Sequence, residues 1–335
     1  MDPAQFFAAS RLAIVAGKGG VGKTTVSGAL ARASARAARP ALLVGVEGKS
    51  GLTFGFERPE LGYEESTLWD SGDPVGTAAV HARALTPDDA LIEYLTDHGL
   101  DRISRRLARS GALEIVSTAA PGIKDILLLG KVKQIERESP DRLVVLDTPA
   151  AGHAVSFLRA PRDLLDSVHV GPIHTQALDV SAMLADPQRC RVLLVTIPEE
   201  TPINELIETA YRLEDELGIA LGPVVVNGVS PEPPPTRVSA AEAADAAGVS
   251  LTAEEAHAID TAASFRRARA DLQHEQLERL AAELPLAQLH LPAIAGVELG
   301  RGDIDRLALA LLDGIGQLDE RVLQGQRSHD EGARE

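Results

Sequence analysis

The chain has 335 residues, 44% of them hydrophobic and only 3% aromatic, so its length and composition predict a large, mainly aliphatic core in one domain with an insertion or in two domains. A formal net charge of −16 argues against nucleic acid as a partner, because phosphate backbones are bound by clustered cations. The single cysteine, Cys190, excludes an intramolecular disulfide and a paired-cysteine zinc site within one chain. With no signal peptide and no apolar run near ~18 residues, we expect a cytoplasmic protein without stable membrane insertion.

Short apolar runs alternate with helical patterns along most of the chain. The run at 12–16 ends at a glycine and precedes a helical pattern at 24–36, and a second run occupies 41–46. Further apolar runs lie at 143–146, 192–196 and 224–226, and further helical patterns lie at 203–216 and 303–312. This alternation predicts an α/β fold with a doubly wound, mostly parallel sheet that binds its ligands at the carboxyl ends of the strands.

Two stretches interrupt the alternation. Residues 85–140 have helical patterns that begin at Thr86-Pro87-Asp88-Asp89, where a capping threonine precedes an acidic first turn. Residues 231–284 begin with a proline-rich segment and continue as an Ala- and Glu-rich helix. We therefore predict a discontinuous core (1–84 and 141–325), an inserted helical subdomain (85–140) and a disordered tail (326–335).

The first strand is followed by a phosphate-binding loop. Gly17 to Thr24 matches the pattern G-x-x-x-x-G-K-[ST], in which glycines let the backbone N–H groups curl around phosphates. Lys23 would reach the β- and γ-phosphates, and the Thr24 hydroxyl would ligate Mg²⁺. The strand before and the helix after disfavour a mere glycine-rich turn. The pattern predicts ATP and Mg²⁺ as cofactors, bound by Gly19, Gly20, Val21, Gly22, Lys23, Thr24 and Thr25.

A second lysine makes this loop unusual. Lys18 opens the segment K-G-G-V-G-K-T-T, which resembles the deviant Walker A loop of a class of dimeric ATPases. By that resemblance, Lys18 is a signature lysine that crosses the dimer interface to the partner's nucleotide. A cation there would stabilise charge that develops on the transferred phosphate. The alternative is a lysine that contacts only its own nucleotide.

Further segments resemble one branch of this class. The segment D-T-P-A-A-G-H at 147–153 resembles switch II, with Asp147 as the Walker B carboxylate for Mg²⁺ and His153 as a positioning residue. V-V-V-N-G-V at 224–229 resembles the strand end whose asparagine, here Asn227, reads adenine. Pro292 lies in a segment similar to the loop that covers the base, and 121–125 resembles a P-G-x-x-E segment. By these resemblances the chain is identified as a member of the arsenical-pump and tail-anchored-protein targeting ATPase superfamily.

The chain also departs from that family. At switch I the family reads D-P-A-H, whereas this chain has Glu47-Gly48-Lys49-Ser50. A glutamate is one methylene longer, so Glu47 would hold the attacking water less well and hydrolysis would be slow, or Lys49 would rearrange the site. Clustered cysteines for arsenite, zinc or iron–sulfur ligands are missing. His169 and His174 lack metal-ligand spacing and are interpreted as structural.

The resemblance implies three functional readings. The leading one is a dimeric Mg·ATP-hydrolysing protein, with Lys18, Glu47 and Asp147 as catalytic residues, that serves a membrane-protein client or a membrane partner. The second is a weakly or non-hydrolysing subunit of a heterodimer with a related ATPase. Glu47 is the feature that distinguishes this reading from the first. The third, a partition or septum-positioning ATPase, would need a basic surface or a membrane helix that the chain does not offer. The apolar helix face Ile123, Ile126, Leu127, Leu129 and Val132 could be core or client surface.

Overall fold

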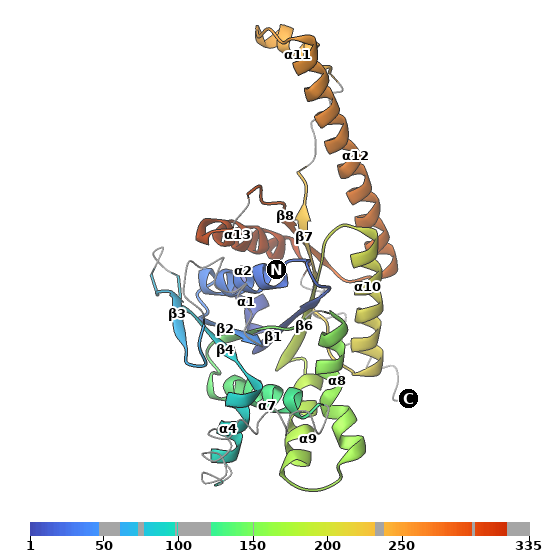
Figure 1. Ribbon diagram of the computed structural model, residues 1–335. Helices are drawn as coiled ribbons and strands as arrows, with labels where there is room; N and C mark the ends of the chain where they lie inside the picture. The colour runs from blue at the N-terminus through green and yellow to red at the C-terminus, as the bar shows by residue number, and fades with distance from the viewer. Residues whose placement is uncertain are drawn as a thin grey trace.

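The structure, a computed structural model, describes residues 1–46, 61–72, 77–97, 99, 122–149, 151–231, 238–296 and 299–319. Its centre is an eight-stranded sheet in the order β3-β4-β2-β5-β1-β6-β7-β8, as Figure 1 shows. The strands are β1 (Leu12–Gly17), β2 (Ala41–Val46), β3 (Ser66–Trp69), β4 (Val80–Leu85), β5 (Leu143–Asp147), β6 (Cys190–Thr196), β7 (Val224–Val229) and β8 (Gln288–Pro292). Every pairing is parallel except that of β3 with β4, which confirms the predicted doubly wound, mostly parallel α/β fold.

Helices cover both faces of this sheet. They are α1 (Pro3–Ala8), α2 (Lys23–Arg36), α4 (Pro87–Asp97), α7 (Ile123–Glu138), α8 (Ala151–Ser167), α9 (Pro172–Ala185), α10 (Glu200–Tyr211), the π-helical turn η1 (Arg212–Glu216), α11 (Ala240–Ala247), α12 (Ala253–Glu283) and α13 (Arg301–Gln317). Successive residues of a strand point to opposite faces. Accordingly, Leu12 and Ile14 join a core with α7, α8, α9 and α10, whereas Ala13 and Val15 join a core with α1, α2 and α13.

Helix α4 begins at the predicted helix entry, within the segment expected to form a helical insertion. The backbone N–H of Asp89 donates to the Thr86 hydroxyl (3.1 Å), so Thr86 caps α4. Residues 98 and 100–121 lie outside the described residues. In α7 the apolar side chains are core, because Ile126, Leu127, Leu129 and Val132 are buried and Ile123 packs against the same cluster. The alternative of a client surface on this helix face is therefore not supported.

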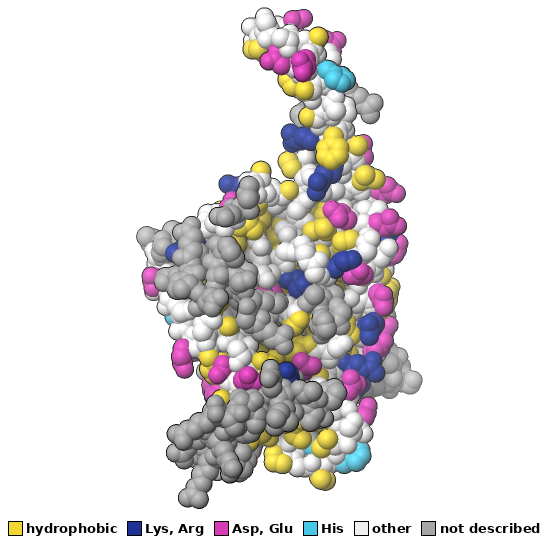
Figure 2. Space-filling model, in the orientation of Figure 1, with side chains coloured by type: hydrophobic (Ala, Val, Ile, Leu, Met, Phe, Trp, Pro, Cys, Tyr) yellow, Lys and Arg dark blue, Asp and Glu magenta, His cyan; other side chains and the backbone are white. Residues whose placement is uncertain are grey.

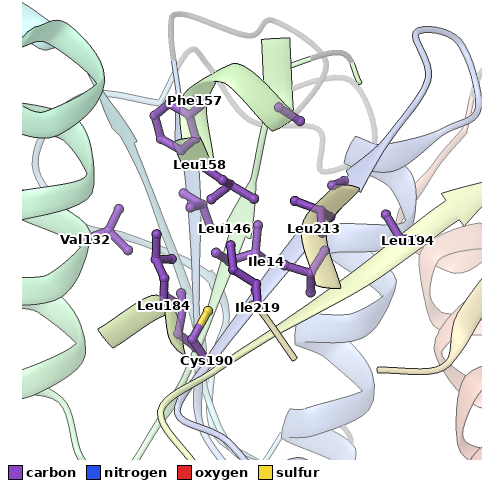
Figure 3. Packing of buried hydrophobic residues seen from close by; sticks show 14 of the residues in the cluster. Ile14, Val132, Leu146, Phe157, Leu158, Leu184, Cys190, Leu194, Leu213 and Ile219 are labelled. Carbon is purple, nitrogen blue, oxygen red and sulfur yellow. The ribbon is translucent and has the colours of Figure 1, made fainter. Parts of the chain in front are cut away.

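Cys190 begins β6 inside the same core. Figure 3 shows its sulfur among buried hydrophobic side chains, with Leu184 and Ile219 close by. Burial raises the pKa of the Cys190 thiol, so the reactive thiolate is suppressed. The only cysteine of the chain is consequently structural.

Helix α12 extends well beyond the sheet and carries α11 at its far end (Figure 1). Its 31 residues correspond to a length of roughly 46 Å. The base of α12 is attached to the body through Gln273, whose Oε1 accepts from the Ser230 backbone N–H (2.9 Å). Arg279 donates to Asn204 of α10, and the Tyr211 hydroxyl donates to the Glu283 carbonyl (3.1 Å). We call residues 238–272 the arm.

Candidate functional site

The phosphate loop follows the central strand of the sheet. β1 lies between β5 and β6, with Val15 opposite Asp147 on one side and Gly17 opposite Val195 on the other. The loop therefore begins where three parallel strands end side by side. Such a carboxyl edge is the usual ligand-binding place in doubly wound sheets.

The glycines of the loop are required by its geometry. A Cβ atom on Gly17 would lie 2.2 Å from the Val195 carbonyl oxygen, so only glycine allows β1 and the loop to approach β6 this closely. Gly22 has φ 87°, in the left-handed region that favours glycine, and a Cβ there would lie 2.4 Å from Nδ2 of Asn227. The pattern G-x-x-x-x-G thus has a steric cause at both ends.

Lys23 and Thr24 open helix α2 directly after this turn. Lys23 is buried, and its Nζ donates to the Lys18 carbonyl oxygen (2.9 Å). The Thr24 hydroxyl donates to Oδ2 of Asp147 (2.7 Å), although the two residues lie 123 positions apart. Asp147 is fully buried at the end of β5. The structure therefore brings the predicted Walker A hydroxyl and Walker B carboxylate into direct contact.

Lys18 points away from its own loop. Its Nζ donates to Oε1 of Glu205 in α10 at 2.5 Å, and the two side chains are 32% and 43% exposed. Two cations, Lys18 and Lys23, and two carboxylates, Asp147 and Glu205, thus surround the loop within the described residues.

The predicted adenine-reading residues lie on the two adjacent strands at one end of the sheet. Asn227 of β7 donates through Nδ2 to the Val21 carbonyl oxygen of the phosphate loop (3.0 Å). Pro292 ends β8 opposite Val229, and the Ala293 backbone N–H donates to the Val229 carbonyl (2.9 Å). Asn227 is therefore beside the loop, and Pro292 is on the next strand.

Other predicted residues belong to segments outside the described part of the chain. Glu47 and Lys49 lie outside the described residues, as does Pro121, and the side chain of His153 is not described either. The strand that leads to Glu47 does end at the site, since Gly45 pairs with Asp147. Within the described ranges, no cluster of three potential metal-ligating side chains occurs, His169 and His174 included. No described helix has the length and apolar character needed to span a membrane.

Two further residues, Thr148 and Glu205, shape the site and were not predicted from the sequence. Thr148 donates through its hydroxyl to the Val15 carbonyl (2.8 Å) and ties the end of β5 to β1. Its position directly after Asp147 was the available signal. Glu205 had no such signal, because it is one of several glutamates in the helical pattern at 203–216.

This loop, with its lysine, threonine and opposed aspartate on a parallel sheet, defines a P-loop nucleotide-binding protein. The chain belongs to the anion-transporting ATPase family, whose model matches residues 10–170. It is 33% identical to ATPase BagA of Mycobacterium tuberculosis over 310 residues, which covers 87% of this chain and 89% of that protein. It is 29% identical to a putative arsenical pump-driving ATPase of Halobacterium salinarum, over 67% of this chain and 36% of that protein. It is 28% identical to ATPase GET3 of Pyricularia oryzae, over 45% of this chain and 43% of that protein.

Proposed function

We propose that this chain binds Mg·ATP at the loop 17–24 and hydrolyses it as a dimer, with Lys18 acting on the partner's nucleotide. The observation that carries the proposal is the 2.7 Å hydrogen bond between Thr24 and Asp147. A threonine that follows the phosphate loop at the start of its helix and an aspartate at the end of a neighbouring strand are the pair that holds Mg²⁺ in P-loop proteins. Family membership supports ATPase activity at the general level.

The residues at the phosphate loop and at the end of β5 fit both Mg²⁺ and the phosphates of ATP. Mg²⁺ prefers oxygen ligands, and the Thr24 hydroxyl and the Asp147 carboxylate supply them from adjacent positions. Gly20 and Gly22 both have φ 87°, a left-handed conformation that lets the backbone N–H groups of such a loop turn toward phosphate oxygens. Bound Mg²⁺ would neutralise charge on the phosphates. Lys23, now held by a backbone carbonyl, would turn toward the β- and γ-phosphates.

The second candidate is a weakly hydrolysing or non-hydrolysing subunit of a heterodimer with a related ATPase. It is favoured by Glu47, which stands directly after β2 where the resembled family has aspartate. β2 itself ends beside β5 at the site, because Gly45 pairs with Asp147. A longer side chain there would misplace the attacking water, and an error of about 1 Å can cost about a hundredfold in rate.

In either candidate function, the protein would act on a membrane-protein client or together with a membrane partner. Among the relatives, one is named a putative arsenical pump-driving ATPase and another is named ATPase GET3. With Cys190 buried and alone, a thiolate metalloid site of the pump type does not fit. We therefore propose a cytoplasmic ATPase whose cargo is a membrane protein or membrane partner, without bound nucleic acid.

The test is Mg²⁺-dependent nucleotide affinity. Equilibrium titration with a fluorescent ATP analogue should show tighter binding with Mg²⁺ than in EDTA. Thr24→Val keeps the shape but removes the hydroxyl, so it should abolish that gain while affinity in EDTA stays within about twofold. Light scattering after size exclusion should show a mass increase with ATP in the wild-type protein. Equal affinity of wild type with and without Mg²⁺ would contradict the assignment of Thr24 and Asp147.

A further inference from the structure

Among the described elements, none covers the outer part of helix α12 on most of its circumference. Its two buried residues, Gln273 and Leu280, lie in the half next to the body. At the far end α11 packs on one side, where the Ala240 backbone N–H donates to Asp260 (2.8 Å). Between these two attachments the helix projects from the body, as Figure 1 shows.

Apolar side chains repeat along one side of this exposed helix. Ala258, Phe265 and Leu272 are spaced by seven residues and so share a face. Phe265 is 69% exposed and Leu272 is 62% exposed. Leu272 precedes the body-facing Gln273 by one residue, which places the stripe about 100° around the helix from the attachment. A large aromatic and a leucine that face solvent at heptad spacing indicate an interaction surface.

The charges on the arm are separated along its length. From 242 to 260 the acidic side chains are Glu242, Asp245, Glu254, Glu255 and Asp260, with no lysine or arginine among them. Next to Phe265 stand Arg266, Arg267 and Arg269, and none of these three forms an ion pair with a carboxylate in the part of the chain that the structure describes. Figure 2 shows this arrangement, with acidic side chains at the far end and basic ones along the middle of the arm.

We infer that the arm pairs antiparallel with the arm of a second copy of this chain. When Phe265 of one copy faces Ala258 of the other, a large side chain meets a small one on both sides of the two-fold axis. Glu254 lies four residues before Ala258, and Arg269 lies four residues after Phe265. The same register therefore brings Arg269 of each copy to Glu254 of the other, and Leu272 close to Leu251.

The distribution of charge along the arm favours antiparallel over parallel pairing, and a second copy over an unrelated partner. A parallel pair would place arginines beside arginines and glutamates beside glutamates, which is repulsive. An unrelated acidic partner would use the arginines but leave the acidic outer part unmatched, whereas a second copy matches both. The paired segment spans only about 30 Å of each helix, and one pair of helices in contact over that length buries less surface area than the interface of a stable dimer. We therefore expect a concentration-dependent contact that lies apart from the phosphate loop and forms without ATP.

Site-directed cross-linking of the full-length chain tests this pairing. Ala262 lies next to the expected two-fold axis, so the Ala262→Cys variant without nucleotide should give a covalent dimer with a short bismaleimide. Cys190 is buried and leaves a low background. Ser264→Cys is the matched control, because two residues further on the side chain points about 200° away. Equal cross-linking of both variants, or none with Ala262→Cys, would overturn the inference.

Charge reversal identifies the partner. In the Ala262→Cys background, Arg269→Glu and Glu254→Arg should each lower the cross-linking rate by about fivefold or more, since each change acts twice in a symmetric dimer. The two together should restore it. Circular dichroism should show unchanged helix content in all three. If single reversals have no effect, or the double reversal fails to restore cross-linking, self-pairing in this register is wrong.

Discussion

The side chain of Lys18 is held within its own chain by Glu205, at 2.5 Å between Nζ and Oε1. Both groups are partly exposed, and exposed ion pairs contribute about 0.2–1 kcal/mol. Lys18 can therefore leave Glu205 at small cost. A lysine that works across a dimer interface would need such a weak resting contact.

The role of Lys18 is tested by replacing it and by mixing. Lys18→Ala should leave nucleotide binding by the monomer nearly intact but weaken ATP-dependent dimerisation or turnover. Mixed with Lys23→Ala protein, it should regain activity, because one site then combines Lys23 of the first protein with Lys18 of the second. A lysine that acts on its own nucleotide would give no rescue on mixing. If Lys18→Ala changes neither association nor hydrolysis, Lys18 has no such role.

Glu205→Gln should release Lys18 from its resting contact. Since the pair contributes at most about 1 kcal/mol, we expect ATP-dependent association to strengthen by up to about fivefold in sedimentation velocity. Glu208→Gln, an exposed change on the same helix, is the control. The effect should vanish in a Lys18→Ala background. A weaker association with Glu205→Gln would instead assign Glu205 a role in the closed dimer.

Lys23→Ala removes the cation that would face the β- and γ-phosphates. Charge-assisted hydrogen bonds are roughly twice as strong as neutral ones, so the affinity for an ATP analogue in Mg²⁺ should fall about tenfold or more, equivalent to roughly 1.4 kcal/mol. Equilibrium titration measures this change. Unchanged affinity would contradict the phosphate-loop assignment.

Glu47 separates the two functional candidates. If it is a slow catalyst, Glu47→Asp should raise kcat and Glu47→Gln should lower it, because positioning of and proton acceptance from water typically carry about 10²–10⁴ in rate. If the chain is a non-hydrolysing subunit, neither change alters its negligible turnover while ATP affinity persists. The assay is run on the chain alone and with any related partner subunit. Brisk wild-type hydrolysis that is unaffected by Glu47→Gln would exclude both readings of this residue.

Gly17 should be sensitive to a single methyl group. In Gly17→Ala the new Cβ would lie 2.2 Å from the Val195 carbonyl oxygen. Because this oxygen belongs to the backbone, no change of side-chain rotamer can relieve the clash. We expect destabilisation by about 1–3 kcal/mol in urea unfolding, together with weaker nucleotide binding. Gly316→Ala in α13 meets no neighbour within 4 Å, so it should be neutral or stabilising by up to about 1 kcal/mol. Equal effects of both changes would contradict the steric account of Gly17.

Much of the sheet could be predicted from apolar runs, because strands buried on both faces contain few polar residues. β1, β2, β5, β6 and β7 were predicted in this way, and β3, β4 and β8 were missed. β4 contains Arg83, which stacks over Tyr63 at 4.5 Å instead of reaching water. β8 is an edge strand in which Gln288 and His290 alternate with apolar residues. Polar side chains with specific partners interrupt the patterns on which such predictions depend.

The candidate site was predictable where spacing determines chemistry. Gly17, Gly22, Lys23 and Thr24 follow a fixed pattern, and the structure places them together. The contact between Thr24 and Asp147 requires β5 to insert beside β1, a strand order that the sequence alone did not provide. Glu205 could not be anticipated, because its contact with Lys18 depends on how α10 packs.

The attachment of α12 to the body connects this long helix to the phosphate loop. Asn227 bonds to the phosphate loop and lies one residue before Gly228, whose carbonyl accepts from the Gln273 side chain at the base of the arm. A second connection runs from Lys18 through α10, where Asn204 neighbours Glu205 and accepts from Arg279. From Gln273 to the start of α12 is roughly 30 Å, so a tilt of about 10° at the base would displace the far end by about 5 Å. A small rearrangement of the loop around a bound phosphate would then move the tip of α12 by about the length of one helical turn.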